Sequence, residues 1–128
     1  MLAAGCFWRT YGPLMATHVD VLVGVARKGV DLVAARRFTP ESMPELTYPL
    51  ERAEAFARRA EARDGGPPAS LAAFRELIAR YRELVDRIDR VRRDTSGGDA
   101  RSALAEPLAR VEAAGDAVRA ALRAEGRI

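Results

Sequence analysis

Apolar residues recur at alternating intervals of three and four between residues 71 and 91, and this pattern constrains the fold more than any other feature of the sequence. Spacing of this kind places the apolar side chains on one face of an α-helix that packs in a bundle. The positions are Leu71, Phe74, Leu77, Ile78, Tyr81, Leu84, Val85, Ile88 and Val91. Residues 104–122 repeat the pattern. Because only a short link separates the two segments, we expect them to pack as antiparallel neighbours.

Glycine and proline divide the chain into four expected helices, over residues 14–37, 49–63, 69–94 and 99–125. Asp99 is a suitable N-cap for the last helix. Pro40 and Pro44, with Pro49 directly after them, exclude one regular helix across residues 39–48. The sequence therefore predicts an all-α protein, an antiparallel up-down four-helix bundle with an irregular Pro-rich segment between the first two helices. In domain terms, residues 1–13 read as an apolar leader or tether and residues 14–128 as the bundle domain. The expected core includes Phe74, Tyr81, Leu84, Ile88, Leu104, Val111 and Leu122.

The first expected helix has two apolar stripes where a corner helix of a bundle needs one. One stripe, which begins at Met15 and Val19, is an ordinary core face. The second consists of four residues that lie within about 40° of one another around the helix: Leu14, Val21, Val25 and Leu32. Residues 1–13 and 39–48 could cover one end of this second stripe. A homodimer or another protein partner would cover the rest, around Val21 and Val25, so these four residues are interface candidates.

Charge and composition argue against nucleic-acid binding. The net charge is +3, but the basic residues alternate with carboxylates, as in Asp86-Arg87-Ile88-Asp89-Arg90. Alternating signs of this kind are typical of a solvated helix face, whereas a nucleic-acid site needs an uncancelled basic stripe. Nucleic acid is therefore not an expected partner.

Little in the sequence points to catalysis or to a cofactor. His18 is the single histidine and Cys6 the single cysteine, so neither a cysteine zinc site nor a c-type haem attachment is present. A di-iron bundle needs a Glu three residues before a histidine, and residue 15 is Met. We expect a half-buried His18, no catalytic, metal or cofactor-binding residue, and a protein that is not an enzyme.

An alternative function is that of a carrier for a small apolar ligand. Residues 39–48 would then form a lid over a cavity at the end of the bundle, with Met43, Leu46 and Tyr48 as the lid candidates. This alternative predicts a closed cavity, whereas the interaction alternative predicts an apolar patch shared between molecules.

The segment Leu2-Ala3-Ala4-Gly5-Cys6 resembles the lipobox of bacterial lipoproteins, in which small residues precede a cysteine that becomes lipidated. It departs from that pattern by Ala3 at the position where leucine is usual, and by lacking a basic region and a longer apolar region before it. Both regions would be supplied if Met1 were internal to a longer signal. The resemblance implies a lipid-anchored, periplasm-facing envelope protein with Cys6 as the lipidation site; without lipidation a cytoplasmic location is expected. The bundle itself resembles no family, so the partner, the ligand and the biological role stay open.

Overall fold

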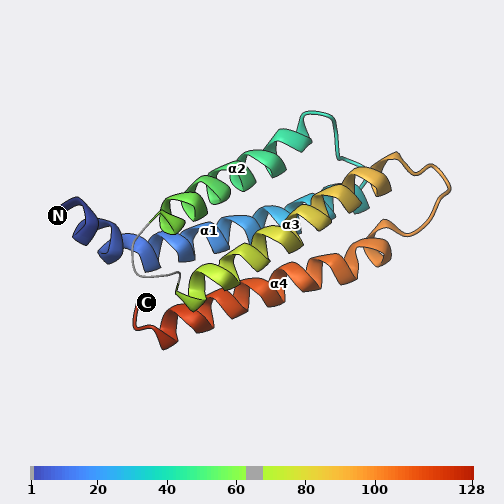
Figure 1. The fold of residues 1–128 in the computed structure, drawn as a ribbon. Helices are drawn as coiled ribbons and strands as arrows, with labels where there is room; N and C mark the ends of the chain where they lie inside the picture. Colours follow the sequence, from blue (N-terminus) through green and yellow to red (C-terminus); the bar gives the residue numbers. More distant parts are fainter. Residues whose placement is uncertain (1, 63–67) are drawn as a thin grey trace.

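The computed structural model describes residues 2–62 and 68–128, with side chains described from Arg9 onward. Within these ranges the chain forms four helices and no strand. They are α1 (Leu2–Ala34), α2 (Ser42–Glu61), α3 (Ala69–Arg93) and α4 (Ala100–Ala124). Successive helices run in opposite directions (Figure 1). The predicted all-α antiparallel bundle is confirmed.

Helices α1 and α3 form the middle of the bundle. Each contacts α2 on one side and α4 on the other, and they also contact each other, whereas no Cα atom of α2 lies within 8 Å of one in α4. Figure 1 shows α2 and α4 on opposite sides of this central pair. Because α1 packs against three helices, it needs more apolar circumference than a corner helix, which accounts for part of its second stripe.

The periodic residues of α3 and α4 are the core. The seven residues predicted to lie there have no exposed surface: Phe74, Tyr81, Leu84, Ile88, Leu104, Val111 and Leu122. The core face of α1 is buried as well, from Met15 through Val33. Tyr81 keeps its hydroxyl satisfied inside this core by donating a 2.6 Å hydrogen bond to the backbone carbonyl of Leu46. Burial raises the pKa of the Tyr81 hydroxyl.

The start of the first helix was predicted wrongly. The expected boundary at Gly12-Pro13 does not end the helix, because α1 runs without interruption from Leu2 through Pro13 to Ala34. The reason is tertiary. Tyr11 is fully buried, and its ring stacks 5.8 Å from that of Phe56 in α2, so packing holds this turn in place despite the proline.

The second helix also begins earlier than predicted, and the irregular segment is shorter. Helix α2 starts at Ser42, so Pro44 falls in its first turn, where the missing N–H has no intrahelical partner to lose. Pro49 lies inside the helix. The irregular connection is therefore residues 35–41. The predicted break at 64–68 lies outside the described residues except for Pro68, which precedes α3.

A polar cluster closes the end of the bundle that carries the C-terminus. The Glu125 carboxylate accepts 2.8 Å hydrogen bonds from the backbone N–H and the hydroxyl of Ser70 in the first turn of α3, and a third from Nε of Arg127. The hydroxyls of Ser70 and Tyr11 are 3.2 Å apart, and the Arg127 guanidinium lies 4.9 Å from the centre of the Tyr11 ring. Burial raises the pKa of Glu125, but the hydrogen bonds from Ser70 and Arg127 outweigh it and lower that pKa. The end of α4 thus supplies the cap that Pro68 cannot give to α3.

Candidate interaction surface

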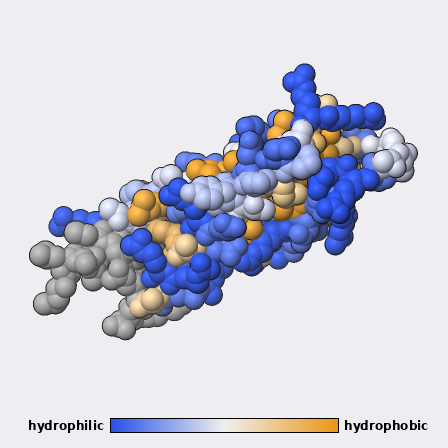
Figure 2. All heavy atoms as spheres, turned by 90° about the horizontal axis from the view of Figure 1, so that it is seen from above, coloured by the Kyte–Doolittle hydropathy of each residue, from blue (hydrophilic) through white to orange (hydrophobic). Residues whose placement is uncertain are grey.

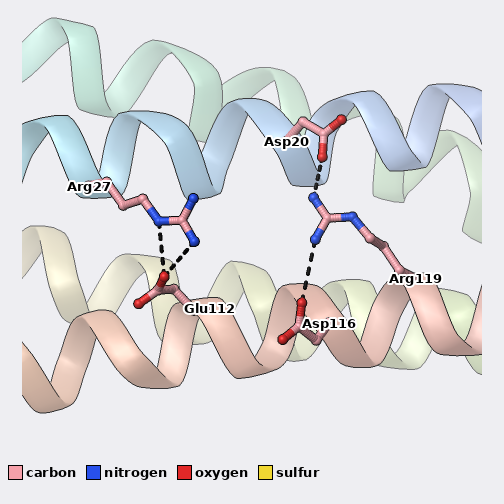
Figure 3. Close-up of polar contacts among 5 residues, drawn as sticks. All are labelled: Asp20, Arg27, Glu112, Asp116 and Arg119. Carbon is pink, nitrogen blue, oxygen red and sulfur yellow. Dashed lines mark hydrogen bonds and ion pairs between the residues drawn. The ribbon is translucent and has the colours of Figure 1, made fainter.

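Ion pairs join α1 and α4 along one edge of the bundle. Arg27 of α1 donates to the Glu112 carboxylate through Nε at 2.9 Å and through a terminal nitrogen at 2.5 Å. Two turns away, Arg119 of α4 binds the Asp20 carboxylate of α1. Figure 3 shows the two pairs side by side across the gap between the helices. We call Asp20, Arg27, Glu112 and Arg119 the α1/α4 ladder.

Close backbone packing beneath the ladder fixes its geometry. A Cβ atom built on Gly115 of α4 would lie 3.0 Å from a methyl carbon of Val23 and 3.2 Å from one of Val19. A side chain at this position would therefore require the Val19 and Val23 side chains to shift by a few tenths of an ångström. The α1 residues of the ladder are exposed, since 58% of the Arg27 side chain and 67% of the Asp20 side chain face solvent, whereas the exposed fraction is 36% for Glu112 and 29% for Arg119. Surface ion pairs of this kind contribute little to folding, so these charges remain available to another molecule.

The four interface candidates are not equally exposed. Leu14 and Val21 are 42% and 43% exposed, which are high values for large apolar side chains. Val25 and Leu32 are half-buried, and Val25 packs against the core. The second stripe is therefore covered in part by the chain itself and open in part. The open part was expected around Val21 and Val25; Val21 is exposed, but Val25 is not, and the partner itself stays a prediction.

The exposed residues of α1 adjoin the ladder. We define the α1 face as the outward side chains between α2 and α4: Leu14, Thr17, Asp20, Val21, Gly24, Arg27 and Lys28. No atom lies within 4 Å of a Cβ built on Gly24, so this part of the helix surface is open. Lys28 lies at the border with α2, where its ammonium is 3.5 Å from the Glu45 carboxylate. By contrast, Figure 2 shows the side of the molecule that carries α2 as mostly hydrophilic, with apolar groups broken up by charged ones.

The three lid candidates belong to α2 and do not form a separate lid. Leu46 is buried in the core and Met43 packs against it, whereas Tyr48 is 60% exposed and lies beside the Arg52 guanidinium. A half-open pocket of about 450 Å³ does exist at the α3–α4 loop end of the bundle. Its walls include Val33, Phe38 and Val91, and none of the lid candidates. The carrier function stays a prediction.

His18 is half-buried, as expected. Its ring lies 5.0 Å from that of Phe56 and 6.1 Å from that of Phe74, centre to centre. Burial, together with the positive charge of Arg52, lowers the pKa of the His18 imidazole. Its neighbours are aromatic, which is the environment of a packing residue.

Cys6 lies in the first turns of α1, and its side chain is outside the described residues. Among residues 2–62 and 68–128, no group of three or more His, Cys, Asp or Glu side chains is arranged to hold a metal ion. None of the helices in the same ranges is both long and apolar enough to cross a membrane.

Comparison with known proteins gives no relative. No protein-family model matches the chain, and no characterised protein or solved structure matches it either.

The ladder was not predicted from the sequence, although a signal for it is present. Asp20 and Arg27 are seven residues apart, as are Glu112 and Arg119, so each pair shares one helix face. Opposite charges repeated at this interval on two helices indicate a seam, but the sequence does not say that α4 is the helix that meets this side of α1.

Proposed function

We propose that the chain is a non-enzymatic helical-bundle protein that associates with another protein through the α1 face. The observation that carries the proposal is the exposure of Leu14 and Val21 on the same helix face as a row of positioned charges. Apolar side chains surrounded by polar ones are the usual composition of a protein–protein interface. With two large apolar side chains, this patch is suited to a small, reversible contact.

Site-specific photo-crosslinking in the native cells tests this function. A photoreactive residue in place of Val21 is expected to give a defined protein adduct. The same residue in place of Arg87, on the exposed face of α3, is the control and should give none. The adduct should also disappear when Arg27→Glu is added, because this reverses one of the charges on the α1 face. Absence of an adduct at Val21, or equal adducts at both positions, contradicts the proposal.

We also propose that the protein is anchored to a membrane by lipid on Cys6, as a cell-envelope lipoprotein. Two observations support this: residues 2–6 resemble a lipobox, and the first turns of α1 extend beyond the ends of the other helices (Figure 1), which leaves room for a membrane surface at that end. Intact-mass spectrometry of the protein from its native cells is the test. A cysteine-lipidated N-terminus that is lost in Cys6→Ser is expected. An unmodified chain beginning at Met1 contradicts the anchoring.

A further inference from the structure

The order of charges along the α1/α4 ladder identifies a partner for the α1 face. We infer that the partner is a second copy of this chain, bound antiparallel across a two-fold axis that passes by Gly24. This inference rests on the proposed function of the α1 face.

The ladder reverses its signs from one end to the other on both helices. Along α1, the negative Asp20 precedes the positive Arg27; at the same two levels, α4 presents the positive Arg119 and the negative Glu112 (Figure 3). A two-fold axis perpendicular to α1 exchanges the two ends of the ladder. It therefore brings Arg27 to Asp20 of the second copy, and Glu112 to Arg119 of the second copy. Every charge of the ladder meets its opposite.

A parallel arrangement of two copies lacks this complementarity. A two-fold axis along α1 lays α4 of one copy over α2 of the other, so Glu112 and Arg119 do not meet the ladder of the second copy. Arg27 instead comes to the level of Lys28 on the α2 side of that copy, which is a like-charge contact. Like charges placed together across an interface are strongly unfavourable, and charge order selects orientation in this way. The ladder thus favours one relative direction of the two chains.

Gly24 lies where the two copies would come closest. With the axis at this residue, Gly24 faces Gly24 of the second copy, and the open space above it allows the two helix backbones to approach. Val21 and Lys28 lie on the α2 side of Gly24, and the axis keeps this side of both copies together, so Val21 lies against the hydrocarbon stem of Lys28 of the second copy. Such a contact shields Val21, which is exposed together with Leu14 in the part of α1 whose side chains are described.

One residue opposes the arrangement. Asp116 is 82% exposed and lies near the midpoint of the ladder on α4, where it comes closest to its own copy. Its carboxylate is 3.5 Å from a guanidinium nitrogen of Arg119, which offsets part of the repulsion. The contact is therefore small and includes one like-charge pair, so we expect a weak dimer that responds to salt concentration.

Exchanging the partners of one ion pair at a time tests the inference without changing the net charge. Variant A carries Asp20→Arg with Arg119→Asp, and variant B carries Arg27→Glu with Glu112→Arg. Each variant keeps both ion pairs of the ladder, although variant A loses the contact between Arg119 and Asp116. Each variant now places like charges together when it pairs with itself. When A is mixed with B, all four ladder charges again meet opposites. The matched control exchanges Glu54 and Arg82, which form an exposed ion pair between α2 and α3.

Sedimentation equilibrium of the full chain is the measurement. The parent and the Glu54/Arg82 control should dimerise reversibly, A and B alone should associate about tenfold or more weakly, and the mixture should recover most of the parent association. A parent that is monomeric at about 1 mM overturns the inference, as does association of A or B equal to that of the parent. An adduct at Val21 with a different protein, combined with a monomeric parent, refutes the second copy and leaves the proposed function standing. If no adduct forms at Val21, both the second copy as partner and the proposed function of the α1 face are refuted.

Discussion

The backbone carbonyl of Arg127 occupies the space where a side chain on Gly12 would begin. A Cβ atom built on Gly12 would overlap this oxygen and the Arg127 Cβ, so the turn that follows α4 seats directly on α1. Glycine at residue 12 is therefore required for contact between α1 and the turn after α4. Glycine destabilises a helix, but the free energy gained from this packing is larger than that loss.

Gly12→Ala and Gly24→Ala form a matched pair of substitutions in one helix. Gly12→Ala should destabilise the protein by about 1–3 kcal/mol, because the backbone of Arg127 must move. Gly24→Ala should stabilise the monomer by up to about 1 kcal/mol, because no atom opposes the new methyl group and alanine favours helix. Urea unfolding of dilute protein measures both free energies. Equal effects of the two substitutions would contradict the account.

The Glu125 cluster should make stability depend on pH in the acid range. Because the folded pKa of Glu125 is lowered, its contribution is present above the unfolded value of about 4.3 and is lost as pH falls through the folded value. Glu125→Gln should cost about 1–2 kcal/mol at pH 7, through lost hydrogen bonds to Ser70 and Arg127. The difference between parent and variant should shrink toward pH 3. Thermal unfolding at a series of pH values measures it, and a difference independent of pH contradicts the role of the carboxylate.

His18 should give a second pH dependence in a separate window. Its folded pKa is lowered, so the unfolded chain takes up a proton first, and stability should fall as pH drops below about 6.5. Since His18 is the only histidine in the chain, His18→Leu should flatten the stability profile between about pH 6.5 and pH 5. Chemical unfolding of parent and variant at each pH makes the comparison. An equal slope in both proteins would show that the imidazole does not titrate differently on folding.

The centre of α3 should be the most sensitive part of the core. Leu84 and Ile88 have no exposed surface, and Leu84→Ala or Ile88→Ala should each cost about 2–5 kcal/mol. Arg87→Ala, on the exposed face between them, is the control and should change stability by less than about 0.5 kcal/mol. Losses below that value at both core positions would contradict the packing.

The sequence predicted those parts of the fold that depend on periodicity and missed those that depend on contacts between distant segments. The core of α3 and α4 follows from apolar spacing alone, and Asp99 caps α4 as expected, accepting a hydrogen bond from the backbone N–H of Arg101. The start of α1 was missed because Gly12 and Pro13 disfavour a helix locally. The packing of the Arg127 backbone against Gly12 is visible only in the three-dimensional structure.

The interaction surface was also predictable only in part, because some of it follows from the periodicity of α1 and the rest depends on contacts between helices. The second apolar stripe of α1 gave four interface candidates, of which Leu14 and Val21 are exposed and Val25 and Leu32 are half-buried. It did not show that Val25 would pack against the core, nor that α4 would supply the other half of a charge ladder. Those facts depend on α1 packing beside three helices, which the residue pattern of α1 does not specify.

The two proposals constrain each other geometrically. Cys6 is eighteen residues from Gly24, about 27 Å along the helix, so an antiparallel dimer separates the two Cys6 residues by about 54 Å. A dimer anchored by both lipids must therefore lie with its long axis in the membrane plane. If vesicle-bound protein stands with its long axis perpendicular to the membrane, the lipid anchor and the antiparallel dimer cannot both be present in the same assembly.

The central claim is antiparallel pairing about Gly24, and pulsed electron–electron spin distances test it most directly. Spin labels at Arg9 or at Ala35, each in a Cys6→Ser background, report the separation of the two copies at either end of α1. Antiparallel pairing predicts about 45 Å between labels at residue 9 and about 33 Å at residue 35, because separation grows by about 3 Å per residue from the axis. Parallel pairing instead keeps both pairs near the ~10 Å spacing of packed helices, widened only by the label arms. Short distances at both positions, or no distance between copies at any protein concentration, would contradict the account.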